Sequence, residues 1–115
     1  MSFHFDSSEM RHLEVDLTKA PASVQRKASR AIRKTAFDIE ADAKILAPVD
    51  TGNLKNSIST DVTLLSAEIG PTASYGYYVE NGTRYQSPQP YMRPAFDRRA
   101  PGLAQALADA GGEIL

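Results

Sequence analysis

The sequence predicts a single α+β domain in which a long N-terminal amphipathic helix packs on a small antiparallel sheet, with short helices at the C-terminal end. Residues 21–46 place apolar side chains every three or four positions, the spacing of a helix with one buried face. Residues 58–64 alternate apolar and polar side chains, the period of a half-buried strand. Proline and glycine divide the C-terminal third into shorter segments.

The composition is that of an ordinary globular chain. With 115 residues, of which 42% are hydrophobic and 23% charged, we expect residues 1–115 to form one domain. No apolar run reaches the roughly 18 residues of a membrane helix, and the N-terminus lacks the pattern of a secretion signal. The absence of cysteine excludes disulfides and thiolate metal sites and suits a reducing cytosol. A net charge of -1 argues against a general nucleic-acid binder.

The long helix is bounded by two prolines. Pro21 suits a first turn, where a missing N–H costs nothing, and Pro48 ends the helix because it restricts the residue before it. The helix is therefore predicted over residues 21–46. Its apolar stripe consists of Val24, Ala28, Ala31, Ile32, Thr35, Ile39, Ala43 and Leu46.

Charges along this helix are segregated, with bases in the first half and acids in the second. The helix dipole favours the reverse order. Because that penalty is small for exposed charges, a solvated face is the simpler interpretation. The alternatives are that the two ends dock onto neighbouring subunits of opposite charge, or that the basic end faces DNA. The bases are Arg26, Lys27, Arg30, Arg33 and Lys34, and the acids are Asp38, Glu40 and Asp42.

The predicted sheet consists of one short strand and one hairpin. Within residues 1–19, interpreted as an arm or an edge strand, the apolar-acidic alternation of residues 13–17 predicts a short strand. Residues 58–64 and 67–70 are predicted to pair as a hairpin, with Pro71 ending the second strand.

The C-terminal part predicts two helical segments joined by an extended one. Residues 75–82 favour a short helix ending at an Asn-Gly pair, with a strand as the alternative. Residues 87–90 hold two prolines and are predicted to be extended. A last helix is expected to carry Pro94 in its first turn, to be interrupted at Pro101–Gly102 and to end at residues 111–112.

The residues give little support to catalysis. His4 and His12, the two histidines, lie near a terminus and show no metal-ligand spacing. No phosphate-binding glycine loop is present. Tyrosine and arginine are enriched in protein interfaces, so we interpret their abundance as a docking surface rather than a platform for single-stranded nucleic acid. The sequence therefore predicts no catalytic residue, no cofactor and no metal.

Three phrases follow the long helix in a set order: APVDTGNLKNSI at residues 47–58, YGYYVENGT at 75–83 and PQPYMRPA at 88–95. Together they resemble the small tail-completion and head-to-tail joining (neck) proteins of long-tailed bacteriophages, a family related to the minor tail protein Z of phage lambda. The resemblance covers roughly residues 20–110. The family's defining positions fall on Pro48, Asp50, Thr51, Gly52, Leu54, Tyr75, Tyr78, Val79, Glu80, Gly82, Pro90, Arg93 and Pro94.

The resemblance implies a structural virion protein of the head-tail junction, not an enzyme, made in the bacterial host cytoplasm from a phage or prophage gene. Such a protein would act in tail completion or tail termination as a ring of copies, expected to be a hexamer. Its implied partners are further copies of itself, the tail-tube protein and the head-connector proteins, with DNA passing through the ring as another candidate and no membrane. The alternative function is nucleic-acid binding by the basic half of the long helix.

The charged residues of the three phrases have structural interpretations. Asp50 and Glu80 could be considered as a hydrolase pair, but each has a simpler role. Asp50 or Thr51 can cap a new helical turn, and Glu80 can pair with Arg84 or Arg93. We predict that the Arg93 side chain reaches Glu80 or Asp50 and locks two of the phrases together.

Overall fold

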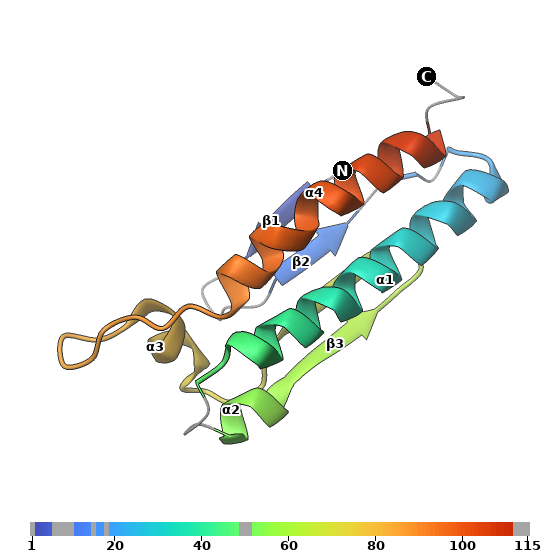
Figure 1. The fold of residues 1–115 in the computed structure, drawn as a ribbon. Helices are drawn as coiled ribbons and strands as arrows, with labels where there is room; N and C mark the ends of the chain where they lie inside the picture. The colour runs from blue at the N-terminus through green and yellow to red at the C-terminus, as the bar shows by residue number, and fades with distance from the viewer. Residues whose placement is uncertain (1, 6–10, 15, 18, 49–51, 112–115) are drawn as a thin grey trace.

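The structure is a computed structural model that describes residues 2–5, 11–14, 16–17, 19–48 and 52–111 (Figure 1). Its helices and strands confirm the predicted α+β class. In chain order they are β1 (Ser2–Phe5), β2 (Arg11–Glu14), α1 (Ala22–Leu46), α2 (Gly52–Ser57), β3 (Ile58–Val62), β4 (Ser66–Pro71), α3 (Gly76–Asn81) and α4 (Met92–Gly111).

The four strands of the sheet lie in the order β1-β2-β4-β3, and every neighbouring pair is antiparallel. The predicted hairpin is confirmed as β3 and β4, with Thr60 opposite Ile69. Leu64, which the alternation included in the first strand, lies in the turn and is largely exposed. The strand predicted at residues 13–17 lies earlier, at Arg11–Glu14, where Leu13 pairs with Ala67 of β4.

Helix α1 packs along β3 and β4 through the predicted apolar stripe (Figure 1). The stripe is buried or half-buried except at Leu46, which is 46% exposed in the last turn. Asp42, assigned to the solvated acids from sequence, is buried in α1. The Thr60 hydroxyl of β3 donates a hydrogen bond to Glu40 at 3.0 Å and ties the edge of the sheet to the helix.

Helix α4 lies beside α1 in the same layer and runs antiparallel to it, so that Ala31 and Ala106 line one groove between the helices. The predicted interruption at Pro101–Gly102 is wrong, because α4 continues through both residues. Proline removes one backbone hydrogen bond, but Pro101 is exposed, so water can reach the carbonyl that loses its partner. Buried Ala95 and Leu103 on either side anchor both halves of the helix.

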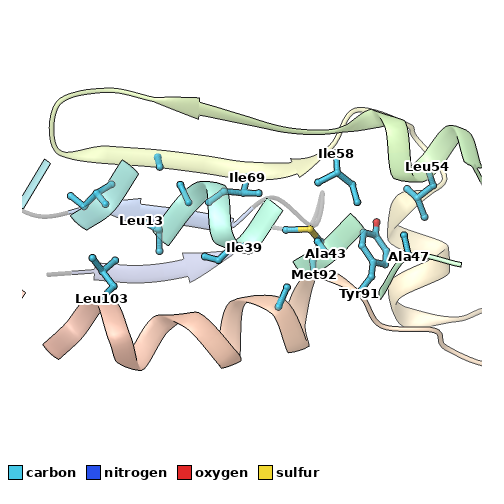
Figure 2. Packing of buried hydrophobic residues seen from close by; sticks show 14 residues of the cluster. Leu13, Ile39, Ala43, Ala47, Leu54, Ile58, Ile69, Tyr91, Met92 and Leu103 are labelled. Atoms are coloured by element: carbon cyan, nitrogen blue, oxygen red, sulfur yellow. The ribbon is translucent and has the colours of Figure 1, made fainter. Parts of the chain in front are cut away.

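The core lies between this helical layer and one face of the sheet (Figure 2). It is built from Leu13 of β2, Ile69 of β4, Ile39 of α1 and Leu103 of α4, all buried. Burial of such side chains stabilises a fold by about 1.5–3 kcal/mol each. The opposite face of the sheet carries exposed polar and acidic side chains, which leaves the molecule with two chemically different outer faces.

Candidate docking site

The segment between α3 and α4 projects from one end of an elongated molecule with principal extents of 52 × 21 × 20 Å (Figure 1). We call residues 82–90 the docking arm. Tyr85 on this arm is 84% exposed, and Tyr78 of α3 is 56% exposed. Tyr75 and Tyr77 are also partly exposed, and the Tyr77 and Tyr78 rings meet edge to face with their centroids 5.5 Å apart. This end of the molecule is therefore rich in accessible aromatic surface.

Glu80 joins α3 to the start of α4. Its side chain is buried, and Oε1 accepts the backbone N–H groups of Tyr91 at 3.2 Å and Met92 at 2.8 Å, while Oε2 accepts that of Arg93 at 3.2 Å. The first N–H groups of a helix have no partner inside the helix, and an anion there also complements the helix dipole. Pro94, the next residue, has no N–H to satisfy. Glu80 thus caps α4 from a different helix.

Tyr91 and Gly76 make a second link between the same two helices. The buried Tyr91 hydroxyl donates a hydrogen bond to the Gly76 carbonyl at 3.0 Å. A Cβ atom on Gly76 would lie 2.7 Å from that hydroxyl and 2.7 Å from Cγ of Pro71. Only glycine therefore allows α3 to approach Tyr91 and β4 so closely.

The docking arm is fixed at both ends and closed near its tip. Gly82 has φ 77°, the left-handed conformation in which glycine carries no steric cost, and its N–H bonds to the Tyr78 carbonyl at 2.8 Å. The Gln89 N–H donates to the Val79 carbonyl at 2.8 Å, and Thr83 pairs with Gln86.

At the tip, the Arg84 guanidinium lies over the Tyr85 ring, 4.9 Å from its centroid, and donates a hydrogen bond to the Tyr85 hydroxyl at 2.6 Å. A groove of about 410 Å³ runs along the base of the docking arm, where Pro88 and Pro90 face Arg93 and Pro94 of α4. An exposed aromatic side chain at the tip of the arm and a proline-lined groove at its base are both suited to contact with another protein.

The structure brings the second and third family phrases together but uses the first one differently. Pro48 follows α1 and is half-buried, Gly52 begins α2, and Leu54 is fully buried in the core cluster that also contains Tyr91. The predicted cap at Asp50 or Thr51 falls outside the described residues. The first phrase therefore supports the site through the core.

The predicted Arg93 lock can be followed only at Glu80, where the donor is the backbone N–H of Arg93 and the Arg93 side chain is exposed. Asp50, the other predicted partner of Arg93, lies outside the described residues. The guanidinium of Arg84, the other candidate partner of Glu80, lies on Tyr85. Sequence alone does not show that Glu80 meets the start of a helix that begins twelve residues later.

A second ionic contact was also missed from sequence. Nε and Nη2 of Arg99 in α4 donate hydrogen bonds to Asp42 of α1 at 2.6 and 3.1 Å. These bonds, which outweigh the opposite effect of burial, hold the pKa of Asp42 below its ordinary value, and Asp42 in turn raises the pKa of Arg99. The available signal was the position of Asp42 beside Ala43, on the apolar stripe of the helix.

The basic residues of α1 lie away from this site. All five are exposed in the N-terminal half of the helix, whereas α3 and the docking arm lie at the end where α1 finishes (Figure 1). The structure therefore separates the predicted charged docking face from the family phrases.

Two further findings concern the described residues. None of their His, Asp or Glu side chains gather in groups of three or more that could hold a metal ion. None of the helices there has the length and apolar character required to cross a membrane.

A small α+β domain with a fixed, exposed aromatic end has the features of a protein-binding structural subunit. The model of the HK97-gp10-like family, described as bacteriophage HK97-gp10, a proposed tail component, matches residues 11–82. Because the match spans more than half of the chain, the protein belongs to this family of phage tail components, which places it among structural proteins of the virion. The match confirms the resemblance based on the three phrases and covers the first two of them. Comparisons with curated proteins and with solved structures gave no match.

Proposed function

We propose that the protein is a tail-completion or tail-terminator subunit at the phage head-tail junction. Copies assemble as a ring, expected to be a hexamer, on the end of the tail tube. The ring then binds the head-connector proteins through α3 and the docking arm. The observation that carries this proposal is the buried Glu80 cap, which fixes the start of α4 and with it the base of the projecting arm that carries the exposed Tyr85.

Rigidity explains why such an arm suits a junction. Binding normally costs about 0.5–1.5 kcal/mol for each flexible side chain that becomes ordered. Bonds at Gly82 and Gln89 order the backbone of the arm before any partner arrives, and Arg84 already holds the Tyr85 ring. Less entropy is therefore lost when Tyr85 enters a partner's surface. Because the protein belongs to a family of phage tail components, its partner is expected to be another virion protein.

The proposal is tested in a phage whose gene for this protein has been deleted. Electron microscopy of lysates is expected to show filled heads and separate tails, and wild-type protein supplied from a plasmid should restore joined particles. Normally joined particles from the deletion phage would overturn the proposal.

The role of the docking arm is tested by supplying the Tyr85→Ala variant in the same way. We expect it to fold normally, because Tyr85 is 84% exposed, yet to restore fewer than about one tenth of the joined particles that wild type restores. Leu64→Ala is the matched control, since it removes another exposed apolar side chain, in the β3–β4 turn. Equal activity of both variants would exclude Tyr85 as a docking residue.

A further inference from the structure

Helix α1 presents a continuous basic surface on the side turned away from the sheet. We call the exposed side chains of Arg26, Lys27, Arg30, Arg33 and Lys34 the basic face. Lys34 at its end already donates a hydrogen bond to Asp38 of the same helix at 2.8 Å, so the arginines carry most of its free charge. Spacings of three and four residues place the arginines in one row on the helix surface. The Arg33 guanidinium lies over the Phe37 ring, 5.7 Å from its centroid, which extends the row with an exposed aromatic side chain.

The uncovered side of the sheet is acidic. Register places Asp61 of β3 opposite Glu68 of β4, and Glu68 opposite His12 of β2. The His12 ring lies between two carboxylates, with Nδ1 3.2 Å from Glu68 and Nε2 3.5 Å from Glu14. We call Glu14, Asp61 and Glu68, all exposed, the acidic face.

Asp61 and Glu68 form an unfavourable pair within one molecule. Like charges directly opposite each other on neighbouring strands repel and destabilise the sheet. Glu68 already contacts the His12 ring, so Asp61 is the carboxylate of this pair that a cation on a neighbouring copy would most relieve.

The two faces lie on opposite sides of the same molecule. Helix α1 packs on the inner face of the sheet, so its outer side and the uncovered side of the sheet point in opposite directions (Figure 1). Surfaces that differ on the two sides of a subunit produce head-to-tail contacts, which close into a ring when the rotation allows it. The net charge of -1 means that copies do not repel strongly as whole molecules.

We propose that the basic face of α1 in one copy binds the acidic face of the sheet in the next copy, and that this contact forms the lateral interface of the ring. The inference rests on the proposed ring and adds the surfaces that build it. Exposed ion pairs are individually weak, so several must act together and the contact must weaken with salt.

Two charge-reversed variants test this contact on tails purified from the deletion phage. The first carries Arg30→Glu and Arg33→Glu, which place two acids in the middle of the basic face. The second carries Asp61→Lys and Glu68→Lys and has two basic faces. At the wild-type half-saturating concentration, each variant alone is expected to leave about tenfold fewer copies on a tail than wild type does.

Mixing the variants gives the decisive result. An equimolar mixture can alternate around an even-membered ring, so it should recover to within about threefold of wild type, as should one chain carrying all four substitutions. Lys55→Glu with Arg98→Glu, at exposed positions outside both faces, is the control of equal charge change and should bind like wild type. Circular dichroism and thermal melting identify any variant that fails to fold. If one variant of the pair fails, the binding of the chain with all four substitutions becomes the test of the contact.

The remaining outcomes separate the interface from the ring itself. The interface would be overturned if wild type bound tails in several copies and both variants bound equally well. The proposed function would then remain intact. A different outcome would assign the basic face to DNA. In that case the second variant does not rescue the first, and the first variant also fails to bind DNA at low salt under conditions in which wild type binds it. Absence of wild-type binding to tails would overturn the proposed function.

Discussion

The carboxylate of Glu80 accepts the backbone N–H of Met92, the first residue of α4, at a distance of 2.8 Å. A helix is usually capped by a polar side chain just before its first turn, but that position is held here by Tyr91, which carries no suitable acceptor there. The cap is supplied by α3 instead. As a result, the docking arm is a loop that Gly82 and Gln89 hold to α3 at both ends, and the buried Glu80 side chain holds the helix that follows it.

Replacing Glu80 by alanine should destabilise the protein by about 2–3 kcal/mol, because three N–H groups at the start of α4 lose their acceptor. Glu80→Gln should cost less, since its amide keeps one acceptor oxygen but turns an NH₂ group toward a donor. Urea denaturation monitored by circular dichroism measures both changes.

Asp97→Ala is the control for the Glu80 variants, because Asp97 is an exposed carboxylate on α4, the helix that Glu80 caps. We expect a change of less than about 0.5 kcal/mol for this surface position. A Glu80→Ala variant as stable as Asp97→Ala would show that the cap contributes nothing to folding. Hydrogen exchange of the Met92 amide gives the local result, since loss of the cap should expose this amide to solvent.

Gly76→Ala should destabilise the protein by roughly 2 kcal/mol, because the new methyl group would overlap the Tyr91 hydroxyl and the Pro71 ring. Tyr91→Phe alone should cost about 1 kcal/mol through loss of the hydrogen bond to the Gly76 carbonyl. In the double variant the methyl group no longer meets a hydroxyl. The combined loss is therefore expected to be smaller than the sum of the two single losses, and simple additivity in a double-mutant cycle would show that the two residues are not coupled.

Gly102→Ala should have the opposite effect. Gly102 lies in the exposed middle of α4, and a Cβ atom there would meet nothing within 4 Å. Replacing glycine by alanine in a helix interior stabilises by about 0.5–1 kcal/mol. The variant also serves as the matched control for Gly76→Ala, and a lower melting temperature than wild type would show that α4 requires flexibility next to Pro101.

Much of the fold could be predicted because its signals are local. The bounds of α1 follow from an apolar period and from Pro21 and Pro48, which lie close to its ends. Strand β2 was placed too late because its position is set by distant pairing, such as that of Leu13 with Ala67, rather than by its own alternation. Pro101 was taken as a break because the cost of proline in a helix can be read from the local sequence. The burial of Leu103, which holds the helix together, can be seen only in the folded chain.

The segments that form the candidate site could be named from sequence, but their contacts could not. The phrases that contain Tyr78 and Pro90 supply α3 and one end of the docking arm. The partner of Glu80 was expected to be an arginine side chain, because Arg84 and Arg93 lie close to it in the sequence. A backbone acceptor role depends on which helix start lies nearby, and only the folded chain supplies that information.

Asp42 is expected to make the stability depend on pH in the acid range. Hydrogen bonds from Arg99 hold the pKa of Asp42 below its ordinary value of about 3.8 in the folded state. A group whose pKa is lowered by folding stabilises the protein fully at pH values above its unfolded pKa, and this contribution disappears as the pH falls through the folded pKa. Asp42→Asn removes the titrating group, so wild type should be the more stable protein at pH 5–7. The difference between the two unfolding free energies should then shrink below about pH 4.

Chemical denaturation at a series of pH values measures this difference, and Asp97→Asn provides the control at an exposed carboxylate of the facing helix. Other carboxylates titrate in the same range, but they are common to both proteins and cancel in the comparison. A difference that stays constant from pH 6 to pH 2.5 would mean that Asp42 has the same pKa in the folded and unfolded chains. Stability depends on pH through Asp42 only if its pKa changes on folding. A constant difference would therefore mean that the contact between Asp42 and Arg99 stabilises the protein through packing and not through charge.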